Sequence, residues 1–600
     1  MIKSLSKFLY ILGEAKGKLV WLFLASITAS LLEAIGIGLI GPFLSLASHP
    51  ESIQDSSFLD WAYRQSGVQT SQQFISIVGL VIALVFCFKA LVYFLVKAYI
   101  YRFSFSQKGK LCSKLIRAYL TVPYTFFLSR NTASIIRNIV IETDKFCYAY
   151  MLPLLDGSAN LVVVIALIFL LGKTDLVFLA IASAVILPVF LLFYTLRKNF
   201  RHWGEEASES RNQMVRIINH SLGGVKETRL IGCEQYFEKQ MDEQGYRYEI
   251  AESLFHYSQI IPRISIETIL VLFLIILVSV SQSFSNGGLE TLIPTLSVFA
   301  VASLRLIPAA SQSIAAIGHL QNATYSVNAI YSDLKETQQQ NNHKNLGLSH
   351  KDKRRNQLSS EFAGQQIMTF RDRIELRNIT YSYPNVKSSA ISNISLNLNK
   401  GESIALIGKS GAGKTTLVDV ILGLLEPEKG DICVDGVSIY KDIRSWQNLI
   451  GYIPQSIFLM DDTIERNIAF GVPNDLIHTE RMNKAIQAAQ LTELIVQLPE
   501  GLQTVVGERG VRLSGGQRQR VGIARALYHE REILVLDEAT SALDNETESL
   551  VNEAIRALSG TKTIIIIAHR LSTVEHCDRI YLLEGGGIVK SGSYQQVVVG

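Results

Sequence analysis

The residues best suited to chemistry lie in a glycine-rich loop at positions 408–415. This loop follows the apolar run 404–407 and leads into a second apolar run, 417–421, which predicts a strand, a loop and a helix in succession. Glycines let consecutive backbone N–H groups turn toward a phosphate, and the N-terminus of the helix adds partial positive charge. We expect Lys414 to reach the β- and γ-phosphates of ATP and Thr415 to offer its hydroxyl to Mg²⁺. The predicted ATP-binding residues of this loop are Gly408, Lys409, Ser410, Gly411, Ala412, Gly413, Lys414, Thr415 and Thr416.

Two adjacent carboxylates follow another apolar run, at residues 533–536. Asp537 and Glu538 would end a buried strand, and ligands of parallel sheets bind beyond the carboxyl ends of the strands. Asp537 fits the acid that supports Mg²⁺. Glu538 fits the base that positions and deprotonates the attacking water.

Gln455 and His569 complete the predicted catalytic set with Glu538. A lone histidine is usually structural, but His569 ends an apolar run that reads as a core strand, so we expect it to face the γ-phosphate. Gln455 offers a neutral amide to Mg²⁺ or to water. The predicted Mg²⁺ ligands are therefore Thr415, Gln455 and Asp537.

A second segment with anion-binding character opens an arginine-rich helix. It consists of Leu513, Ser514, Gly515, Gly516 and Gln517. A Ser-Gly-Gly helix start presents backbone N–H groups to an anion. The phosphate loop of the same chain does not need such a segment, so we predict a nucleotide site shared between two chains.

The elements that position these residues form an α/β domain, which we place at residues 371–600. From Arg373 onward, short β-rich and helical patterns alternate. This alternation is typical of a mostly parallel sheet covered by helices.

The composition indicates a second domain within the membrane. A chain of 600 residues exceeds what one hydrophobic core supports. Hydrophobic residues make up 48% of it, and the mean hydropathy is positive. The net charge of +4 gives no support for a nucleic-acid partner. The six cysteines lack metal or disulfide spacing, which favours free thiols in a reducing compartment.

We predict six membrane-spanning helices within residues 1–330. They lie near 19–48, 73–101, 146–172, 175–197, 256–283 and 291–320. Lys and Arg are concentrated before the first span and in the segments between spans 2 and 3 and between spans 4 and 5, which indicates that these segments are cytoplasmic. The prediction is a multi-pass protein of the plasma membrane (a bacterial inner membrane) with its N-terminus and ATPase domain in the cytoplasm.

The two inner segments, 102–145 and 197–254, are much longer than turns require. We expect them to be helical stalks, with bends at 123–127 and 223–227 that contact another domain; ordinary loops are the alternative. The polar stretch 331–370 is predicted to be a linker between the two domains.

Five ionisable residues lie inside the predicted spans: Glu33, Lys89, Arg263, Glu267 and Arg305. Such residues at bilayer depth mark a pathway or form pairs. In one hypothesis, Lys89, Arg263 and Arg305 form a ring of positive charge, doubled by dimerisation, that contacts an anionic substrate. In the structural alternative, Arg263 pairs with Glu267 one turn away and Glu33 neutralises Lys89.

Taken in order, these motifs resemble an ATP-binding cassette (ABC) exporter half-transporter, over essentially the whole chain. The resemblance implies that residues 408–415 are Walker A, 533–538 are Walker B and 513–517 are the signature. It also implies that Gln455 is the Q-loop residue and His569 the switch histidine.

Further roles come from the resemblance alone. It implies that Tyr383 stacks on adenine, that Glu508 belongs to an X-loop contacting the partner's membrane domain, and that Ser541 and Asp544 form a D-loop. In this family two half-transporters dimerise and hold two ATP molecules, each between Walker A of one chain and the signature of the other. The inner segments then match coupling helices.

A narrower resemblance concerns the substrate. Residues 31–43 and 304–308 are similar to segments of lipid-linked oligosaccharide flippases and polysaccharide-associated exporters. We therefore expect an exporter or flippase, driven by ATP and Mg²⁺, that moves an amphipathic anionic substrate such as a lipid-linked oligosaccharide or glycolipid out of the inner leaflet by alternating access, as a homodimer. A multidrug or hydrophobic-peptide exporter is the alternative. A channel or regulatory protein that only binds ATP would lack the base or the switch histidine, and both are present.

Overall fold

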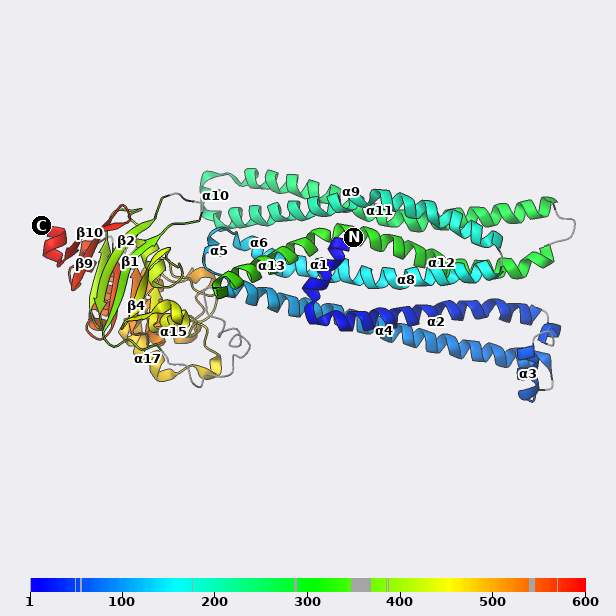
Figure 1. Cartoon of the computed structure of the whole chain (residues 1–600), viewed down its shortest axis with the longest axis horizontal. Coiled ribbons are helices and arrows are strands. Elements are labelled where there is room, and N and C mark those ends of the chain that lie inside the picture. Colours follow the sequence, from blue (N-terminus) through cyan, green and yellow to red (C-terminus); the bar gives the residue numbers. More distant parts are fainter. Residues whose placement is uncertain are drawn as a thin grey trace. The chain divides into compact units, whose positions relative to one another are not determined.

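The computed structural model describes residues 2–48, 50–53, 57–68, 70–174, 176–284, 289–346, 368–384, 386, 388–538, 545–568 and 570–599. The chain divides into two compact units. The helical unit comprises residues 1–122 and 126–349, and the sheet unit comprises residues 350–600 together with 123–125. Figure 1 labels the elements of both units.

Six long helices dominate the helical unit (Figure 1). They are α2 (Lys16–Ser48), α4 (Ser71–Thr121), α8 (Leu152–Thr174), α9 (Leu176–Gly223), α11 (Glu234–Phe284) and α12 (Leu289–Asn322). Each contains most or all of one predicted span. Within the described residues, three stretches are long and apolar enough to cross a membrane: Lys3–Ile40, Ser71–Thr121 and Thr132–Phe169. The other three spans include side chains outside the described ones, so the total of six stays a prediction.

The predicted helical stalks are present. Helix α4 has 51 residues, as does α11. At 1.5 Å per residue each is about 75 Å long, more than twice the roughly 30 Å hydrocarbon core of a bilayer. The chain turns between α4 and α5 and between α9 and α10, where the sequence predicted bends.

Shorter helical elements complete the helical unit. They are α1 (Ile2–Leu12), α3 (Ser57–Gln65), α5 (Thr125–Leu128), α6 (Thr132–Arg137), α7 (Thr143–Lys145), α10 (Val225–Ile231), α13 (Thr324–Leu346), the turns η1 (Gly13–Ala15) and η2 (Pro50–Ile53), and the π-helical segments η3 (Asn138–Glu142) and η4 (Phe146–Met151).

Helix α13 occupies the first part of the stretch that we predicted to be a polar linker from residue 331. Its Asp333 is buried, accepts hydrogen bonds from Arg130 (2.8 Å) and Asn138 (2.6 Å), and also bonds the Tyr119 hydroxyl. A buried carboxylate with three donors fixes this part of the helix to the stalks. The first part of the predicted linker is therefore helical up to Leu346, and its Asp333 belongs to a satisfied network rather than to a solvated tether. Residues 347–367 lie outside the described part of the chain.

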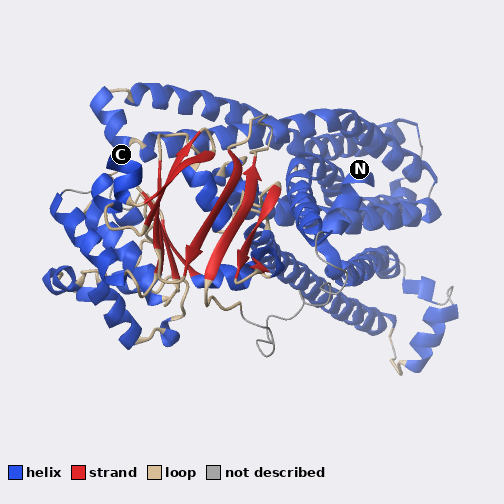
Figure 2. Cartoon of the chain, turned by 60° about the vertical axis from the view of Figure 1, so that its left-hand side comes forward, coloured by secondary structure: helices blue, strands red, loops and turns tan. Residues whose placement is uncertain are grey.

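The sheet unit contains two β-sheets, shown in red in Figure 2. One is antiparallel, in the order β2-β1-β4-β5, and the other has the order β10-β9-β3-β8-β7-β6. In the second sheet β6, β7, β8, β3 and β9 are parallel, and β10 is antiparallel to β9. The strands are β1 (Arg373–Tyr381), β2 (Ile391–Asn399), β3 (Ser403–Ile407), β4 (Lys429–Val434), β5 (Val437–Ser438), β6 (Ile450–Ile453), β7 (Ile533–Asp537), β8 (Thr563–Ile567), β9 (Arg579–Glu584) and β10 (Gly587–Gly592).

Helices cover this mostly parallel sheet, as the alternating pattern predicted. They are α14 (Lys414–Ile421), α15 (Ile443–Leu449), α16 (Ile464–Ile468), α17 (Thr479–Ala488), α18 (Thr492–Gln497), α19 (Gly515–Tyr528), α20 (Asn545–Leu558) and α21 (Leu571–Val574). All residues of β7 and β8 are buried, because apolar side chains on both faces pack against helices or the second sheet. The predicted α/β fold of this domain is therefore confirmed.

Candidate nucleotide site and intramembrane charges

The phosphate loop connects β3 to α14, as the sequence predicted. Gly413 has φ of 96° in the left-handed region, and a Cβ there would lie 2.7 Å from the carbonyl oxygen of Ala390. Only glycine fits both the conformation and the space. Lys414 is buried and donates through Nζ to the carbonyl oxygens of Gly408 (2.8 Å) and Lys409 (3.1 Å). The lysine thus lies along the inside of its own loop.

The strand register brings the other motifs to the same edge. Leu406 of β3 and Asp537 of β7 both lie beside Ile567 of β8, and Leu536 of β7 lies beside Ile453 of β6. Since parallel strands present their carboxyl ends at one edge, the segments after β3, β7 and β6 converge there.

Glu538 and Gln455 meet at this edge. Gln455 donates through Nε2 to Glu538 Oε2 at 2.6 Å. Glu538 adopts a positive φ of 50°, and its backbone N–H bonds the carbonyl oxygen of Ile567 at 3.0 Å. A non-glycine residue in this conformation is uncommon and aims the side chain away from the line of the strand. The geometry joins two of the three residues of the predicted catalytic set.

The predicted Mg²⁺ ligands are oxygen donors of the kind that this ion prefers. Asp537 is buried at the end of β7, and Thr415 is exposed in the first turn of α14. The amide nitrogen of Gln455 donates its hydrogen bond to Glu538, which leaves the amide oxygen for a second contact. These donors fit the Mg²⁺ that accompanies ATP, which would screen the carboxylates and orient the phosphates.

Tyr383 lies beside the phosphate loop. Its hydroxyl and the Thr416 hydroxyl are 3.0 Å apart, and its ring packs edge-on against Tyr381 with centroids 5.3 Å apart. This position is compatible with the predicted stacking on adenine.

The signature segment forms a capped helix start. Ser514 accepts from the Gln517 backbone N–H at 3.2 Å, and Gln517 Oε1 accepts from the Ser514 backbone N–H at 2.8 Å. This reciprocal capping fixes the two glycines between them as the first residues of α19. Its role at a nucleotide held by another chain stays a prediction.

The remaining predicted residues of this domain are placed as follows. Glu508 is exposed in the short 3₁₀ turn Glu508–Gly510. His569, Ser541 and Asp544 lie outside the described residues. Their roles stay predictions.

Two side chains near the site were not predicted. Asp419 lies one turn after Thr415 on α14, and Tyr452 of β6 donates its hydroxyl to Asp537 at 3.2 Å. Burial, together with the charge of Asp537, raises the pKa of Asp419 to about 6. The sequence did contain a signal for Asp419, because this carboxylate interrupts the apolar run 417–421 that follows the phosphate loop.

The intramembrane charges are only partly brought together. Arg305 on α12 donates through Nη2 to Glu33 on α2 at 2.5 Å, so Glu33 pairs with Arg305 rather than with Lys89. Lys89 on α4 lies within electrostatic range of both residues. Arg263 on α11 is exposed, and the described residues include no ion pair between it and Glu267. The structure thus groups Lys89, Arg305 and Glu33, while the ring of Lys89, Arg263 and Arg305 stays a prediction.

Lys89 lies against a gap left by a glycine. Its Nζ is 4.4 Å from the centroid of the Phe86 ring, a cation–π distance. A Cβ on Gly36 of α2 would lie 3.2 Å from Lys89 Cδ, tighter than most such contacts. The missing side chain at position 36 thus makes room for the lysine.

Comparison with known proteins decides the family. The model of the ABC transporter transmembrane region matches residues 19–305, and the ABC transporter model matches residues 391–541. An ATP-dependent lipid A-core flippase of Cupriavidus metallidurans is 31% identical over 489 residues, which cover 80% of this chain and 77% of that protein. The chain belongs to the ABC transporter family.

Other similar proteins agree with this assignment. A lipid A-core flippase of Burkholderia pseudomallei is 30% identical over 488 residues, covering 79% of this chain and 76% of the relative. A solved bacterial Atm1-family ABC exporter with ATP bound is 22% identical, with a TM-score of 0.71 and 96% of each chain covered. The latter likeness shows a shared fold.

The ABC assignment confirms the expected organisation and chemistry. A helical transmembrane region precedes an ABC ATPase domain, so the chain is a membrane half-transporter that binds ATP and couples its hydrolysis to transport. One such half carries one phosphate loop and one signature segment. This architecture implies pairing with a second half.

We predict that Glu538→Gln lowers ATP turnover by about 10²- to 10⁴-fold while ATP binding is retained. The substitution keeps an oxygen that can accept from Gln455 but removes the proton acceptor. Phosphate release and binding of a fluorescent ATP analogue measure the two effects. Glu493→Gln, on an exposed carboxylate of α18, is the matched control. Turnover near the wild-type rate would remove Glu538 as the base.

We also predict a pH-dependent effect of Asp419→Asn. The folded chain holds a proton on Asp419 that the unfolded chain releases, so the free energy of unfolding falls as pH rises from about 4 to about 6 and is level above that. The variant should lack this fall and be more stable than wild type above pH 6. After allowance for solvent screening, the gain is on the order of 1 kcal/mol.

Thermal unfolding of the purified full chain in nucleotide-free buffer with a chelator, measured across this pH range, checks the effect. Asp475→Asn, at an exposed site, is the control and should follow the wild-type profile. An unchanged pH profile in Asp419→Asn would contradict the assignment of the proton to Asp419.

Proposed function

We propose that this half-transporter moves an amphipathic anionic glycolipid or lipid-linked oligosaccharide out of the inner leaflet. The observation that carries the proposal is the charge cluster of Glu33, Lys89 and Arg305 on three different helices of the membrane region. Two cations against one carboxylate leave a net positive charge at bilayer depth. Such charge is costly unless a counter-ion is available for part of the cycle.

The hydrogen bonding of Arg305 supports a role in binding. Its Nη2 donates a hydrogen bond to Glu33, but its Nε is buried and has no hydrogen-bond partner among the described residues. A buried donor of this kind costs stability until it is satisfied. A phosphate or pyrophosphate oxygen would satisfy it, because guanidinium groups bind these anions through paired N–H donors.

The names of relatives support this class of substrate. Curated proteins 30–31% identical to this chain are named ATP-dependent lipid A-core flippases. An anionic glycolipid matches the basic cluster of Lys89 and Arg305. For the present chain we propose this class of substrate and not one particular lipid.

We further propose how ATP drives the movement. Two copies close on two nucleotides, each held by the phosphate loop of one chain and the signature segment of the other. Glu538 positions the water, Gln455 and Asp537 hold Mg²⁺, and His569 contacts the γ-phosphate. The D-loop residues Ser541 and Asp544 and the X-loop Glu508 contact the partner.

In the remainder of the proposed cycle, the stalks link the ATPase domains to the membrane region. Closure of the ATPase domains is conveyed through the long helices to the membrane region, which changes from inward- to outward-facing. Hydrolysis then resets the transporter. We place it in the bacterial inner membrane, with the N-terminus and ATPase domain in the cytoplasm, since the basic segments flank the inner ends of the spans.

Substrate-stimulated ATPase activity and lipid translocation in proteoliposomes test the proposed substrate. Lipid A-core glycolipid and polyprenyl-pyrophosphate glycans are compared with hydrophobic drugs and peptides. Stimulation by the anionic lipids supports the proposal. Stimulation by drugs or peptides alone would favour a multidrug or peptide exporter instead.

We predict that Lys89→Gln and Arg305→Gln each raise the substrate concentration for half-maximal stimulation by about 10- to 100-fold. Each removes a charge-assisted hydrogen bond, while basal ATPase activity stays within about twofold of wild type. Arg263→Gln is tested in parallel, and Lys198→Gln, an exposed cation of α9, is the control. Unchanged stimulation by Lys89→Gln and Arg305→Gln would reject their role.

The shared nucleotide sites predict complementation between inactive chains. Neither Lys414→Ala nor Gly515→Asp homodimers should hydrolyse ATP. A mixed dimer of the two retains one intact site, formed by the loop of the Gly515→Asp chain and the signature of the Lys414→Ala chain. We expect co-assembly of the two variants to restore ATP hydrolysis. A chain that carries both Lys414→Ala and Gly515→Asp should give no hydrolysis in a heterodimer with the wild-type chain, because each of the two sites then has one defective half. Absence of restoration in isolated heterodimers would exclude shared sites.

A further inference from the structure

Tyr452 is the third residue of β6 and lies on the same face of the sheet as the predicted metal ligand Asp537. The parallel register places Tyr452 beside Val535 of β7. Asp537 follows Val535 by two residues, so its side chain returns to the same face. Val535 packs in the apolar cluster that contains Leu417 of α14. Tyr452 therefore lies on the face that the helix after the phosphate loop covers.

The length of the tyrosine side chain brings its hydroxyl to the end of the neighbouring strand. At about 3.3 Å per residue, Asp537 lies about 7 Å beyond the position beside Tyr452. A phenol covers this distance, whereas the short side chain of serine or threonine does not. The Tyr452 hydroxyl donates to Asp537 Oδ2 at 3.2 Å. This distance is at the long end for a hydroxyl–carboxylate bond, as is common at reaction sites before the substrate tightens them.

Close packing fixes the strand that carries this donor. A Cβ on Gly451 would lie 2.9 Å from Leu534 Cδ2 of β7 and 3.2 Å from Ala526 Cβ of α19, so β6 packs against both elements without space for a side chain there. Ile450 and Ile453 of the same strand are buried. A shift of β6 along β7 would therefore disrupt the core.

The same segment donates to both carboxylates of the site. Three residues after Tyr452, the Gln455 amide donates to Glu538 Oε2 at 2.6 Å. Tyr452 and Gln455 thus each serve one of two adjacent acids. A donor at Asp537 also offsets part of the negative charge that Asp419 of α14 brings close to it.

Packing of the ring does not require the hydroxyl. Tyr452 is 38% exposed, and phenylalanine would fill the same space. Carboxylates that ligate metals are themselves hydrogen-bonded, and these partners orient the ligand. Orientation matters especially for Mg²⁺, because this ion demands nearly ideal octahedral geometry.

We propose that Tyr452 is a positioning residue for the Mg²⁺ that accompanies ATP. Its hydroxyl fixes the plane of the Asp537 carboxylate and thereby orients this ligand before the metal binds. The inference rests on the proposed role of Asp537 as a Mg²⁺ ligand, and it is independent of the transported substrate.

Metal binding by the full-length protein tests this role. Mn²⁺ replaces Mg²⁺ as the probe, because it prefers the same oxygen ligands and electron paramagnetic resonance distinguishes its free and bound forms. With a non-hydrolysable ATP analogue present, we expect Tyr452→Phe to raise the Mn²⁺ concentration for half-saturation by about 10- to 100-fold. Binding of the analogue in excess chelator should be unchanged, because the phosphate loop is intact.

Competition by two other cations separates orientation of the ligand from general damage to the site. Ca²⁺ accepts a flexible arrangement of ligands, whereas Mg²⁺ does not. Tyr452→Phe should therefore weaken displacement of Mn²⁺ by Mg²⁺ more than displacement by Ca²⁺. An equal loss for the two cations would contradict a role in orientation.

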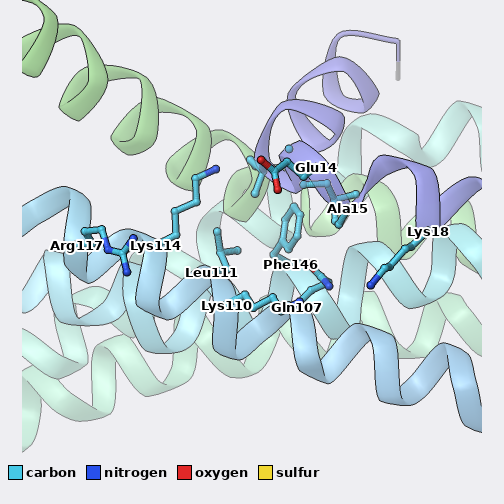
Figure 3. A pocket seen from close by; sticks show the side chains of 12 residues that line it. Glu14, Ala15, Lys18, Gln107, Lys110, Leu111, Lys114, Arg117 and Phe146 are labelled. Atoms are coloured by element: carbon cyan, nitrogen blue, oxygen red, sulfur yellow. The ribbon is translucent and has the colours of Figure 1, made fainter. Parts of the chain in front are cut away.

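Two controls match the change in side chain and the charge of the probe. Tyr440→Phe, on the turn η6 (Ile439–Lys441), removes a buried hydroxyl that has no hydrogen-bond partner among the described residues. The metal–nucleotide complex is an anion, and a cavity of about 660 Å³ in the helical unit is lined by several cations (Figure 3). Lys110→Gln/Lys114→Gln/Arg117→Gln removes three of them. Both controls should bind Mn²⁺ and the analogue like wild type.

Asp537→Asn, measured in parallel, separates this inference from the proposal on which it rests. Weaker Mn²⁺ binding by Asp537→Asn together with unchanged binding by Tyr452→Phe would overturn the role of Tyr452 alone. Unchanged binding by both variants would also reject Asp537 as a metal ligand. Loss of analogue binding by Tyr452→Phe to the same extent with and without metal would mean that the residue only supports the fold of the site, and would likewise overturn the inference.

Discussion

The parallel pairing of β3, β8, β7 and β6 is the constraint on which the nucleotide chemistry depends. Because their register aligns Leu406, Ile567 and Asp537, the phosphate loop, the carboxylates and Gln455 reach one edge from three distant parts of the chain. The buried apolar side chains of these strands fix that register, since a shift would also displace the helices packed on them.

The same edge concentrates negative charge. Asp419, Asp537 and Glu538 surround one end of the loop that holds Lys414. Burial lowers the pKa of Lys414, and the two carboxylates at 537 and 538 oppose that change. Such crowding suits a site whose natural ligand arrives with a divalent cation, because the metal offsets the repulsion among the carboxylates. In the membrane region the imbalance among Glu33, Lys89 and Arg305 has the opposite sign, which suits the proposed anionic substrate.

Sequence reasoning was most successful where local pattern and chemistry coincide. An apolar run followed by charged or glycine residues predicted β3 with its loop and β7 with Asp537, because burial on both faces leaves a continuous hydrophobic stretch. The sequence did not predict which side chains from distant elements lie close together in the fold. The choice of Glu33 between Arg305 and Lys89 depends on how helices are rotated about their axes, and the closeness of Asp419 to Asp537 depends on packing of α14 against the sheet. The burial of Asp333 likewise requires donors nearly two hundred residues away or more.

The glycine at position 36 affects where a charge can lie in the membrane region. Lys89 occupies its place because the neighbouring helix has only a hydrogen atom there. An alanine Cβ there would lie 3.2 Å from Lys89 Cδ, so the lysine side chain would have to shift slightly although no ionisable residue had changed. The placement of a charge in the membrane region therefore depends also on small, uncharged positions, which an inventory of acidic and basic residues would overlook.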